Sequence, residues 1–299
     1  MMERRRWGLL LVFILGMVFS LCKNESVLRA AEVSSDAEWK KNLTGSAGVL
    51  EGKSVLISIY IEDPVTRWSE KDKNEASKKV MCASRYIKKQ AKKYGKDVTI
   101  IADRKKYKDI CYDHQTRLKI KDSNKSQMKL YKEMKKFIED QVDVTAIREK
   151  YGTDSIGFLF HVNKSGLSST MVHYIQDGTK YFYECSTLFS RYEKKPEGAS
   201  TYAHEILHLF GARDLYERSL PDGILSSFVR YVERKFPNDI MYSTYTMSGK
   251  QLKYRIKNEI SRITAYFLGW RESIPERKKY ALPDMGENKG CFSDGTDLY

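Results

Sequence analysis

One short stretch, residues 201–216, constrains this 299-residue chain more than any other. It reads TYAHEILHLFGARDLY, with His204 and His208 four positions apart and Glu205 directly after the first histidine. On an α-helix this spacing puts both imidazoles on one face, close enough to hold a single metal ion. Glu205 then lies about a quarter-turn away, where it can reach a water molecule bound to that ion. The stretch therefore predicts a metal-binding helix.

The same stretch predicts which face of the helix is buried and where the helix ends. Four apolar residues fall on roughly the opposite side from the histidines: Ala203, Ile206, Leu207 and Phe210. Gly211 can end the helix by taking a left-handed conformation, which turns the chain back towards the histidines. Asp214 then supplies a carboxylate as third ligand, with Glu217 as the alternative. The complete pattern is HExxHxxGxxD.

Apolar runs upstream of this helix predict a layered α/β fold. Residues 55–61, 98–102 and 155–162 have the apolar, β-branched composition of buried strands, and residues 70–94 and 128–151 have helical periodicity. Two shorter strands, 170–175 and 180–185, flank the turn signal Asp177-Gly178 and predict a hairpin. The order favours an α/β layer with an antiparallel edge. Further helices are expected at 224–235 and 253–268.

The N-terminus predicts export from the cytoplasm. Glu-Arg-Arg-Arg at 3–6 precedes an apolar run at 7–21, which is typical of a secretory signal peptide. An uncleaved anchor is the alternative, although the run is short for a spanning helix. Cys22 offers lipidation as a minority alternative, because Leu21 is too bulky for the residue before a lipidated cysteine. The expected location is secreted or at the extracellular surface.

The chain divides into four parts on these signals. Residues 1–30 form the signal peptide or N-terminal anchor, 31–48 a polar linker, 49–272 the folded domain and 273–299 a charged C-terminal tail. Four cysteines remain beyond Cys22, and an even number permits two disulfides, with free thiols as the equal alternative. We expect a monomer.

The net charge of +14 narrows the range of partners. A basic protein can bind nucleic acid, an anionic membrane or a cell-wall polymer. No nucleic-acid motif accompanies the charge, so we interpret it as a solvated lysine-rich surface and expect no nucleic-acid partner. Membrane attachment is expected only through the N-terminal segment.

Two segments resemble the metzincin clan of zinc endopeptidases. The first is the HExxHxxGxxD stretch, and the second is Asp-Ile-Met-Tyr at 239–242, which is similar to the methionine turn that passes beneath the metal in that clan. Most metzincins carry a third histidine where this chain has Asp214, and the aspartate form is similar to the snapalysin branch. In a second departure, Ser243 stands where some metzincins carry a tyrosine, and Tyr242 and Tyr245 flank it.

The resemblance implies a zinc-dependent endopeptidase that acts on a protein or peptide. Its domain would have a mostly parallel twisted sheet, an antiparallel edge strand, an active-site helix and a C-terminal helix after the methionine turn. One Zn²⁺ would be held by His204, His208 and Asp214, with Glu205 as general base. Supporting positions would be Gly211, Met241 and Tyr242. The alternative function is a catalytically inactive metzincin-like binding module at the cell surface.

Overall fold

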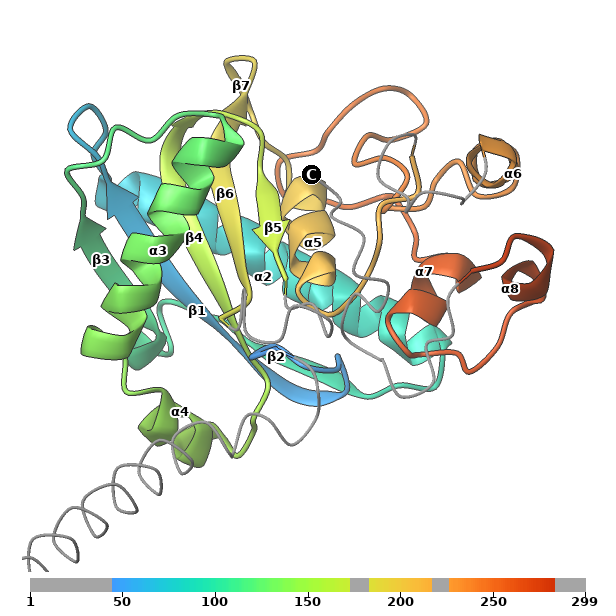
Figure 1. Cartoon of the computed structure of the whole chain (residues 1–299), viewed down its shortest axis with the longest axis horizontal. Coiled ribbons are helices and arrows are strands. Elements are labelled where there is room, and N and C mark those ends of the chain that lie inside the picture. Colours follow the sequence, from blue (N-terminus) through green and yellow to red (C-terminus); the bar gives the residue numbers. More distant parts are fainter. Residues whose placement is uncertain (1–44, 173–182, 217–225, 283–299) are drawn as a thin grey trace, which may run out of the picture. The chain divides into compact units, whose positions relative to one another are not determined.

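A mixed, mostly parallel sheet of seven strands forms the centre of the protein (Figure 1). The computed structural model describes residues 45–172, 183–216 and 226–282. The order across the sheet is β2-β1-β4-β6-β5, with β3 also beside β1 and β7 beside β6. The strands are β1 (Gly52–Glu62), β2 (Val98–Ile101), β3 (Cys111–Gln115), β4 (Ile156–Ser165), β5 (Ser169–Met171), β6 (Cys185–Tyr192) and β7 (Lys195–Pro196). The α/β class predicted from sequence is confirmed.

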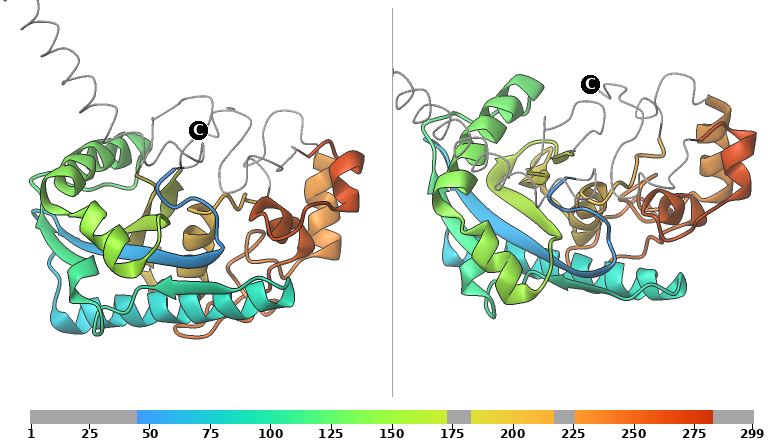
Figure 2. Two further views of the ribbon diagram at one scale, coloured as in Figure 1. Left: turned by 90° about the horizontal axis from the view of Figure 1, so that it is seen from below. Right: turned by 60° about the horizontal axis from the view of Figure 1, so that its bottom comes forward.

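Helices cover both faces of this sheet. α3 and α4 lie on one face and the long helix α2 lies on the other (Figure 1, Figure 2). Helix α5 packs beside α2 and against β5 and β6. The α-helices of the described residues are α2 (Glu70–Lys93), α3 (Asn124–Gln141), α4 (Val144–Tyr151), α5 (Ala199–His208), α6 (Ser226–Lys235), α7 (Arg262–Phe267) and α8 (Pro275–Lys279). A short 3-10 helix, η2 (Lys108–Ile110), precedes β3.

Alternation along the strands explains how one sheet serves two helical layers. Leu56 of β1, Leu159 of β4 and Leu188 of β6 are fully buried in one core cluster with α2 and α5. Because successive strand residues point to opposite faces, the intervening residues of each strand face α3. A strand buried on both faces reads as a continuous apolar run, as β1 does.

Two helices expected from periodicity are shorter in the structure. The expected helix 128–151 is two helices, because Asp143 accepts a hydrogen bond from Ala146 N (2.9 Å) and starts α4 as its N-cap. The expected helix 253–268 is helical only as α7 within Arg262–Phe267. Residues before it run as a strap, since Asn258 donates to the carbonyls of Ser243 (2.7 Å) and Tyr245 (3.0 Å). Polar side chains outcompeted the helical pattern at both places.

The predicted hairpin before α5 is correct in its antiparallel pairing and wrong in its extent. β5 pairs antiparallel with β6, and Thr170 lies opposite Ser186. However, β6 begins at Cys185, where the predicted second strand ended. The turn signal at 177–178 lies outside the described residues. Sequence analysis also missed β3, whose polar alternation suits a half-exposed strand at the sheet edge.

The segment before β1 is joined to the sheet by hydrogen bonds. Ala47 N donates to a carboxylate oxygen of Glu184 (2.9 Å), and Glu184 N donates to Ser46 Oγ (3.0 Å). Ile156 N donates to the Ser46 carbonyl (2.7 Å), which ties the segment to β4. Ser46, Ala47 and Glu184 are all buried. These contacts make residues 46–47 part of the folded domain.

Two further sequence expectations concern cysteines and membranes. Cys82, Cys111 and Cys185 are free thiols, so the alternative of two disulfides is wrong. Cys22 and Cys291 lie outside the described residues. Within the described ranges, none of the helices combines the length and the apolar character needed to cross a membrane.

Candidate metal centre

Helix α5 carries the histidines and is buried in the core of the protein. Nine of its ten residues are buried, the exception being His208, which is partly exposed. The four residues predicted to form its apolar face are fully buried: Ala203, Ile206, Leu207 and Phe210. A ten-residue helix is marginal by itself, so this packing against α2 and the sheet stabilises it. Gly211 has a positive φ of 89°, which confirms that the chain turns there after the helix.

The structure brings the three predicted ligands together. His204 Nε2 lies 3.1 Å from His208 Nε2. Asp214 Oδ1 lies 3.1 Å from His204 Nε2 and 3.2 Å from His208 Nε2. The three atoms therefore form a nearly equilateral triangle, and these residues are a group that could hold a metal ion. Glu217, the alternative third ligand, lies outside the described residues.

Backbone carbonyls fix which nitrogen of each histidine faces the centre. His204 Nδ1 lies 3.0 Å from the Ile240 carbonyl oxygen, and His208 Nδ1 lies 2.7 Å from that of Ala212. A carbonyl only accepts hydrogen bonds, so both Nδ1 atoms carry a hydrogen and act as donors. In the neutral rings, each Nε2 then turns a lone pair towards the other and towards Asp214. Metal-binding histidines are oriented by this kind of contact.

The electrostatics of the triangle favour a positive charge at its centre. Burial opposes a charge on His204, but the Asp214 carboxylate outweighs it and raises the pKa of His204 to about 9. Burial also opposes ionisation of Asp214, yet the two histidines hold the pKa of that carboxyl well below its usual range. The buried Asp214 Oδ1 accepts no hydrogen bond of good geometry from the described residues. A cation satisfies all three donor atoms at once.

The donor set fits zinc by number, type and spacing. Zinc sites use histidine nitrogens at about 2.0–2.1 Å and carboxylate oxygens at about 2.0–2.2 Å in tetrahedral geometry, which spaces neighbouring donors by about 3.3 Å. The three distances of the triangle, 3.1, 3.1 and 3.2 Å, are close to that value. Three protein ligands are the number found in catalytic zinc sites, which keep one position for water or substrate.

Glu205 is fixed beside the triangle by the edge strand. Thr170 Oγ1 of β5 donates to Glu205 Oε2 (2.8 Å), and Ser186 Oγ of β6 donates to the Glu205 carbonyl (3.0 Å). Glu205 is close enough to His204 that its charge helps to raise the pKa of that ring. The carboxylate is thus buried and oriented next to the metal ligands. Sequence analysis did not identify Thr170 or Ser186, because single hydroxyl residues on strands carry no spacing signal.

The loop at 239–242 lies against the triangle and is anchored by Asp239. The Ile240 carbonyl contacts His204, and the Met241 carbonyl accepts from Leu215 N (3.0 Å) one residue after Asp214. Asp239 is fully buried and accepts from Met241 N (2.7 Å), Ser261 N (2.8 Å) and Thr264 Oγ1 (2.8 Å). The Asp239 carboxylate therefore connects this loop to the start of α7.

Three tyrosines follow the ligands and the methionine in sequence, and their surroundings differ. Tyr216 Oη donates to Asp214 Oδ2 (2.8 Å), a contact that sequence analysis missed. Met241 is fully buried, and Tyr242 is a partly buried residue that packs against the main core cluster. Tyr245 is 46 % exposed. The sequence signal for the contact between Tyr216 and Asp214 is that Tyr216 follows Asp214 by two residues.

The other histidines contact groups outside the triangle. His161 is fully buried, stacks on Tyr60 with 4.7 Å between ring centroids, and lies 3.2 Å from Ser58 Oγ. Burial lowers the pKa of His161 to about 3, so this ring is neutral. His114 Nε2 lies 2.8 Å from Oε1 of Glu133, a residue of α3. His173 lies outside the described residues.

Comparisons with known proteins gave no relative. No protein-family model matches the chain, and no curated protein matches it either.

Proposed function

We propose that the protein is a zinc-dependent endopeptidase with a metzincin-like active site. The observation that carries the proposal is the triangle of His204, His208 and Asp214 with Glu205 on the same helix. A zinc ion bound there would lower the pKa of a bound water and polarise a substrate carbonyl. The resemblance to the HExxH motif and to the methionine turn supports this reaction class.

Glu205, next to His204 on the same helix, would act as the general base. It accepts the proton from the attacking water as the C–O bond forms, and later transfers it to the leaving amine as the C–N bond breaks. Its hydrogen bond from Thr170 keeps the carboxylate oriented. An Asp ligand in place of a third His adds negative charge, which would make a metal held there a weaker Lewis acid. Glu205 would then contribute a larger share of the activation of the water.

The edge strand β5 is the proposed binding site for an extended peptide. β5 pairs with β6 on one side, and no other described strand pairs with it. A peptide that added to this edge would gain backbone hydrogen bonds. Since Thr170 of β5 contacts Glu205, such a peptide would run past the general base and the metal ligands.

The test is to measure bound zinc and peptide cleavage together in the protein and in Glu205→Gln. We expect about one zinc per chain in both, and a loss of cleavage of about 100- to 10,000-fold in the variant. Unchanged cleavage with zinc retained would remove Glu205 as the base. A folded protein that takes up no zinc would instead favour the inactive binding module.

A further inference from the structure

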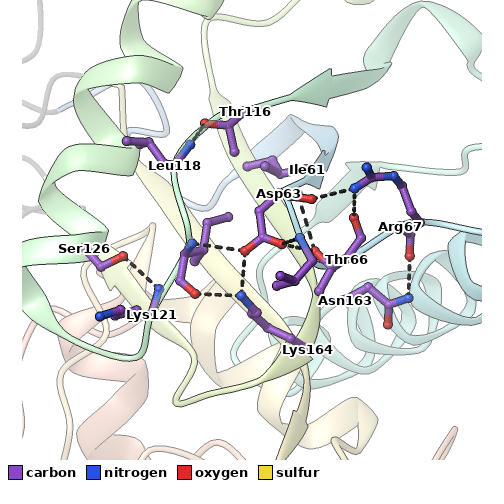
Figure 3. Close-up of polar contacts among 12 residues, drawn as sticks. Ile61, Asp63, Thr66, Arg67, Thr116, Leu118, Lys121, Ser126, Asn163 and Lys164 are labelled. Carbon is purple, nitrogen blue, oxygen red and sulfur yellow. Dashed lines mark hydrogen bonds and ion pairs between the residues drawn. The ribbon is translucent and has the colours of Figure 1, made fainter.

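Three loops meet around one buried carboxylate at the carboxyl ends of β1 and β4 (Figure 3). Asp63 Oδ1 accepts from Val65 N (3.0 Å) and Thr66 Oγ1 (2.8 Å). Its Oδ2 accepts from Ile120 N (3.0 Å) and Lys164 Nζ (2.6 Å). These bonds hold three segments side by side: the loop 63–67, the loop 116–123, and residues 163–168, which are the end of β4 and the loop after it. We call their outer side the three-loop surface.

Two aliphatic side chains project from the three-loop surface. Val65 is 63 % exposed and Leu167 is 57 % exposed, although apolar residues of that size are normally buried. Both backbones are fixed by aspartates, since Leu167 N donates to Asp122 Oδ2 (3.0 Å) and Val65 N donates to Asp63. The side chains are therefore presented outwards from ordered loops.

Lysines gather beside these two residues. A cavity of about 370 Å³ lies next to the 116–123 loop and is lined by Leu118, two serines and four lysines, with no acidic residue. The four lysines are Lys119, Lys121, Lys125 and Lys129. None of these four forms an ion pair with any residue in the described ranges. Arg67, on the first of the three loops, has a side chain that is 66 % exposed. The four lysines thus lie on the segment that holds Leu167 through Asp122, and Arg67, which pairs with Glu62 (3.7 Å), adds a cation near Val65.

We propose that the three-loop surface docks the protein on a membrane that carries anionic phospholipids. Lysines near such a membrane are attracted to its negative surface potential, each raising binding by about fivefold. Val65 and Leu167 would enter the interfacial region, where burial of aliphatic side chains adds a second, weak contribution. A soluble polyanion would use the lysines alone and would leave the two aliphatic side chains in water.

This surface goes beyond the proposed protease chemistry and beyond attachment by the N-terminal segment. It lies on the part of the sheet where β1 and β4 end, and it includes none of His204, Glu205, His208 or Asp214. Docking through it would hold the folded domain in one orientation on the lipid. Stable attachment commonly requires two weak signals, and a basic patch can supply one of them.

The test is amide hydrogen exchange of the full chain on lipid vesicles. On vesicles with about one third phosphatidylglycerol, exchange at 63–67 and 163–168 should slow several-fold relative to pure phosphatidylcholine vesicles, and the difference should vanish in 0.5 M salt, where the screening length is only about 4 Å. Reading these loops makes the result independent of where the N-terminal segment lies. Equal protection on both kinds of vesicle would overturn the proposal.

Charge variants supply the matched control. Lys119→Ala/Lys121→Ala/Lys125→Ala should abolish the slowing and weaken binding to anionic vesicles by about 100-fold, at fivefold per lysine. Lys89→Ala/Lys92→Ala/Lys93→Ala removes the same charge from α2, on the opposite face of the sheet, and should leave the slowing intact. Equal losses in both variants, or the same slowing with soluble polyphosphate and no vesicles, would contradict membrane docking.

Discussion

Two aspartates in different parts of the molecule, Asp63 and Asp214, have their oxygens satisfied in opposite ways. Asp63 receives four hydrogen bonds, from two backbone amides, a hydroxyl and a lysine. Asp214 receives one at Oδ2, from Tyr216, while its Oδ1 lies 3.1 Å from His204 Nε2 and 3.2 Å from His208 Nε2. A carboxylate with a full set of donors stabilises the fold. One whose oxygen lies beside two histidine nitrogens is suited to a cation, either a proton on a ring or a metal ion.

Asp214→Asn should produce the largest change in metal binding. An amide oxygen is a neutral and weaker ligand, and loss of one of three ligands removes roughly a third of a zinc binding free energy of about 10–16 kcal/mol, or about 1000-fold in affinity. Competition with a chromophoric chelator measures this. Glu217→Gln is the matched control and should leave the affinity unchanged; the reverse pattern would make Glu217 the third ligand.

Asp63→Asn should show the opposite behaviour, with a large effect on stability and none on metal affinity. Removal of one partner from the buried Asp63–Lys164 pair should lower the free energy of unfolding by about 3 kcal/mol at pH 7. Urea unfolding with and without zinc measures both properties. A change in zinc affinity as large as that of Asp214→Asn would erase the distinction between the two aspartates.

The stability difference should also depend on pH in a defined direction. Burial raises the pKa of Asp63, but the hydrogen bonds to its carboxylate, led by those from Lys164 and Thr66, together lower the pKa by more. The folded pKa therefore lies below the unfolded value of about 3.9. The stabilisation is then fully present above the unfolded pKa and is lost as the pH falls below it. Unfolding at pH 7 and pH 3 should show the gap to Asp63→Asn narrowing, and a gap that widens would contradict the assignment.

Asp239 is intermediate between Asp63 and Asp214. Its carboxylate has a full set of donors, as that of Asp63 has, yet it anchors the loop whose Ile240 carbonyl orients His204. In Asp239→Asn an N–H of the amide would oppose the Ser261 N–H, and zinc affinity should fall by about 10- to 100-fold, as for other residues that orient ligands. Chelator competition, with Asp63→Asn as control, measures this. Unchanged affinity would make Asp239 purely structural.

Thr170 should have the smallest effect, confined to turnover. Thr170→Val removes the hydrogen bond to Glu205 Oε2, and kcat should fall by about tenfold, equivalent to about 1.4 kcal/mol, while zinc content stays the same. Thr170→Ser retains a hydroxyl and should preserve most of the activity. Steady-state kinetics on one peptide measure both, and equal losses in the two variants would point to packing of the methyl group instead.

Sequence patterns identified the parts of the fold and site that depend on periodicity or fixed spacing. The β1 strand is a continuous apolar run, the α2 helix has apolar residues at helical spacing, and the HExxHxxGxxD stretch has fixed spacing, so each could be inferred from the sequence. The contacts of Thr170, Ser186 and Asp239 could not be predicted, because each joins segments that are distant in the chain. Only the folded sheet and loops place those groups together.

Where pattern and structure disagreed, a local polar contact decided the outcome. Asp143 begins a new helix inside a region of continuous helical periodicity, and Asn258 holds an expected helix as an extended strap. Each competes with the backbone hydrogen bonds of a helix. Periodicity reports which face is apolar, whereas such contacts determine where the element stops.

The hydrogen bonds of Ser46 and Ala47 limit where the chain can be trimmed during maturation. A cut after Ala47 would remove the amide that meets the buried Glu184 carboxylate, and with it the Ser46 carbonyl that accepts from Ile156 N. Removal of one hydrogen-bond partner from a buried polar group costs about 1–3 kcal/mol. Any processing protease that leaves a stable domain must therefore cut upstream of Ser46.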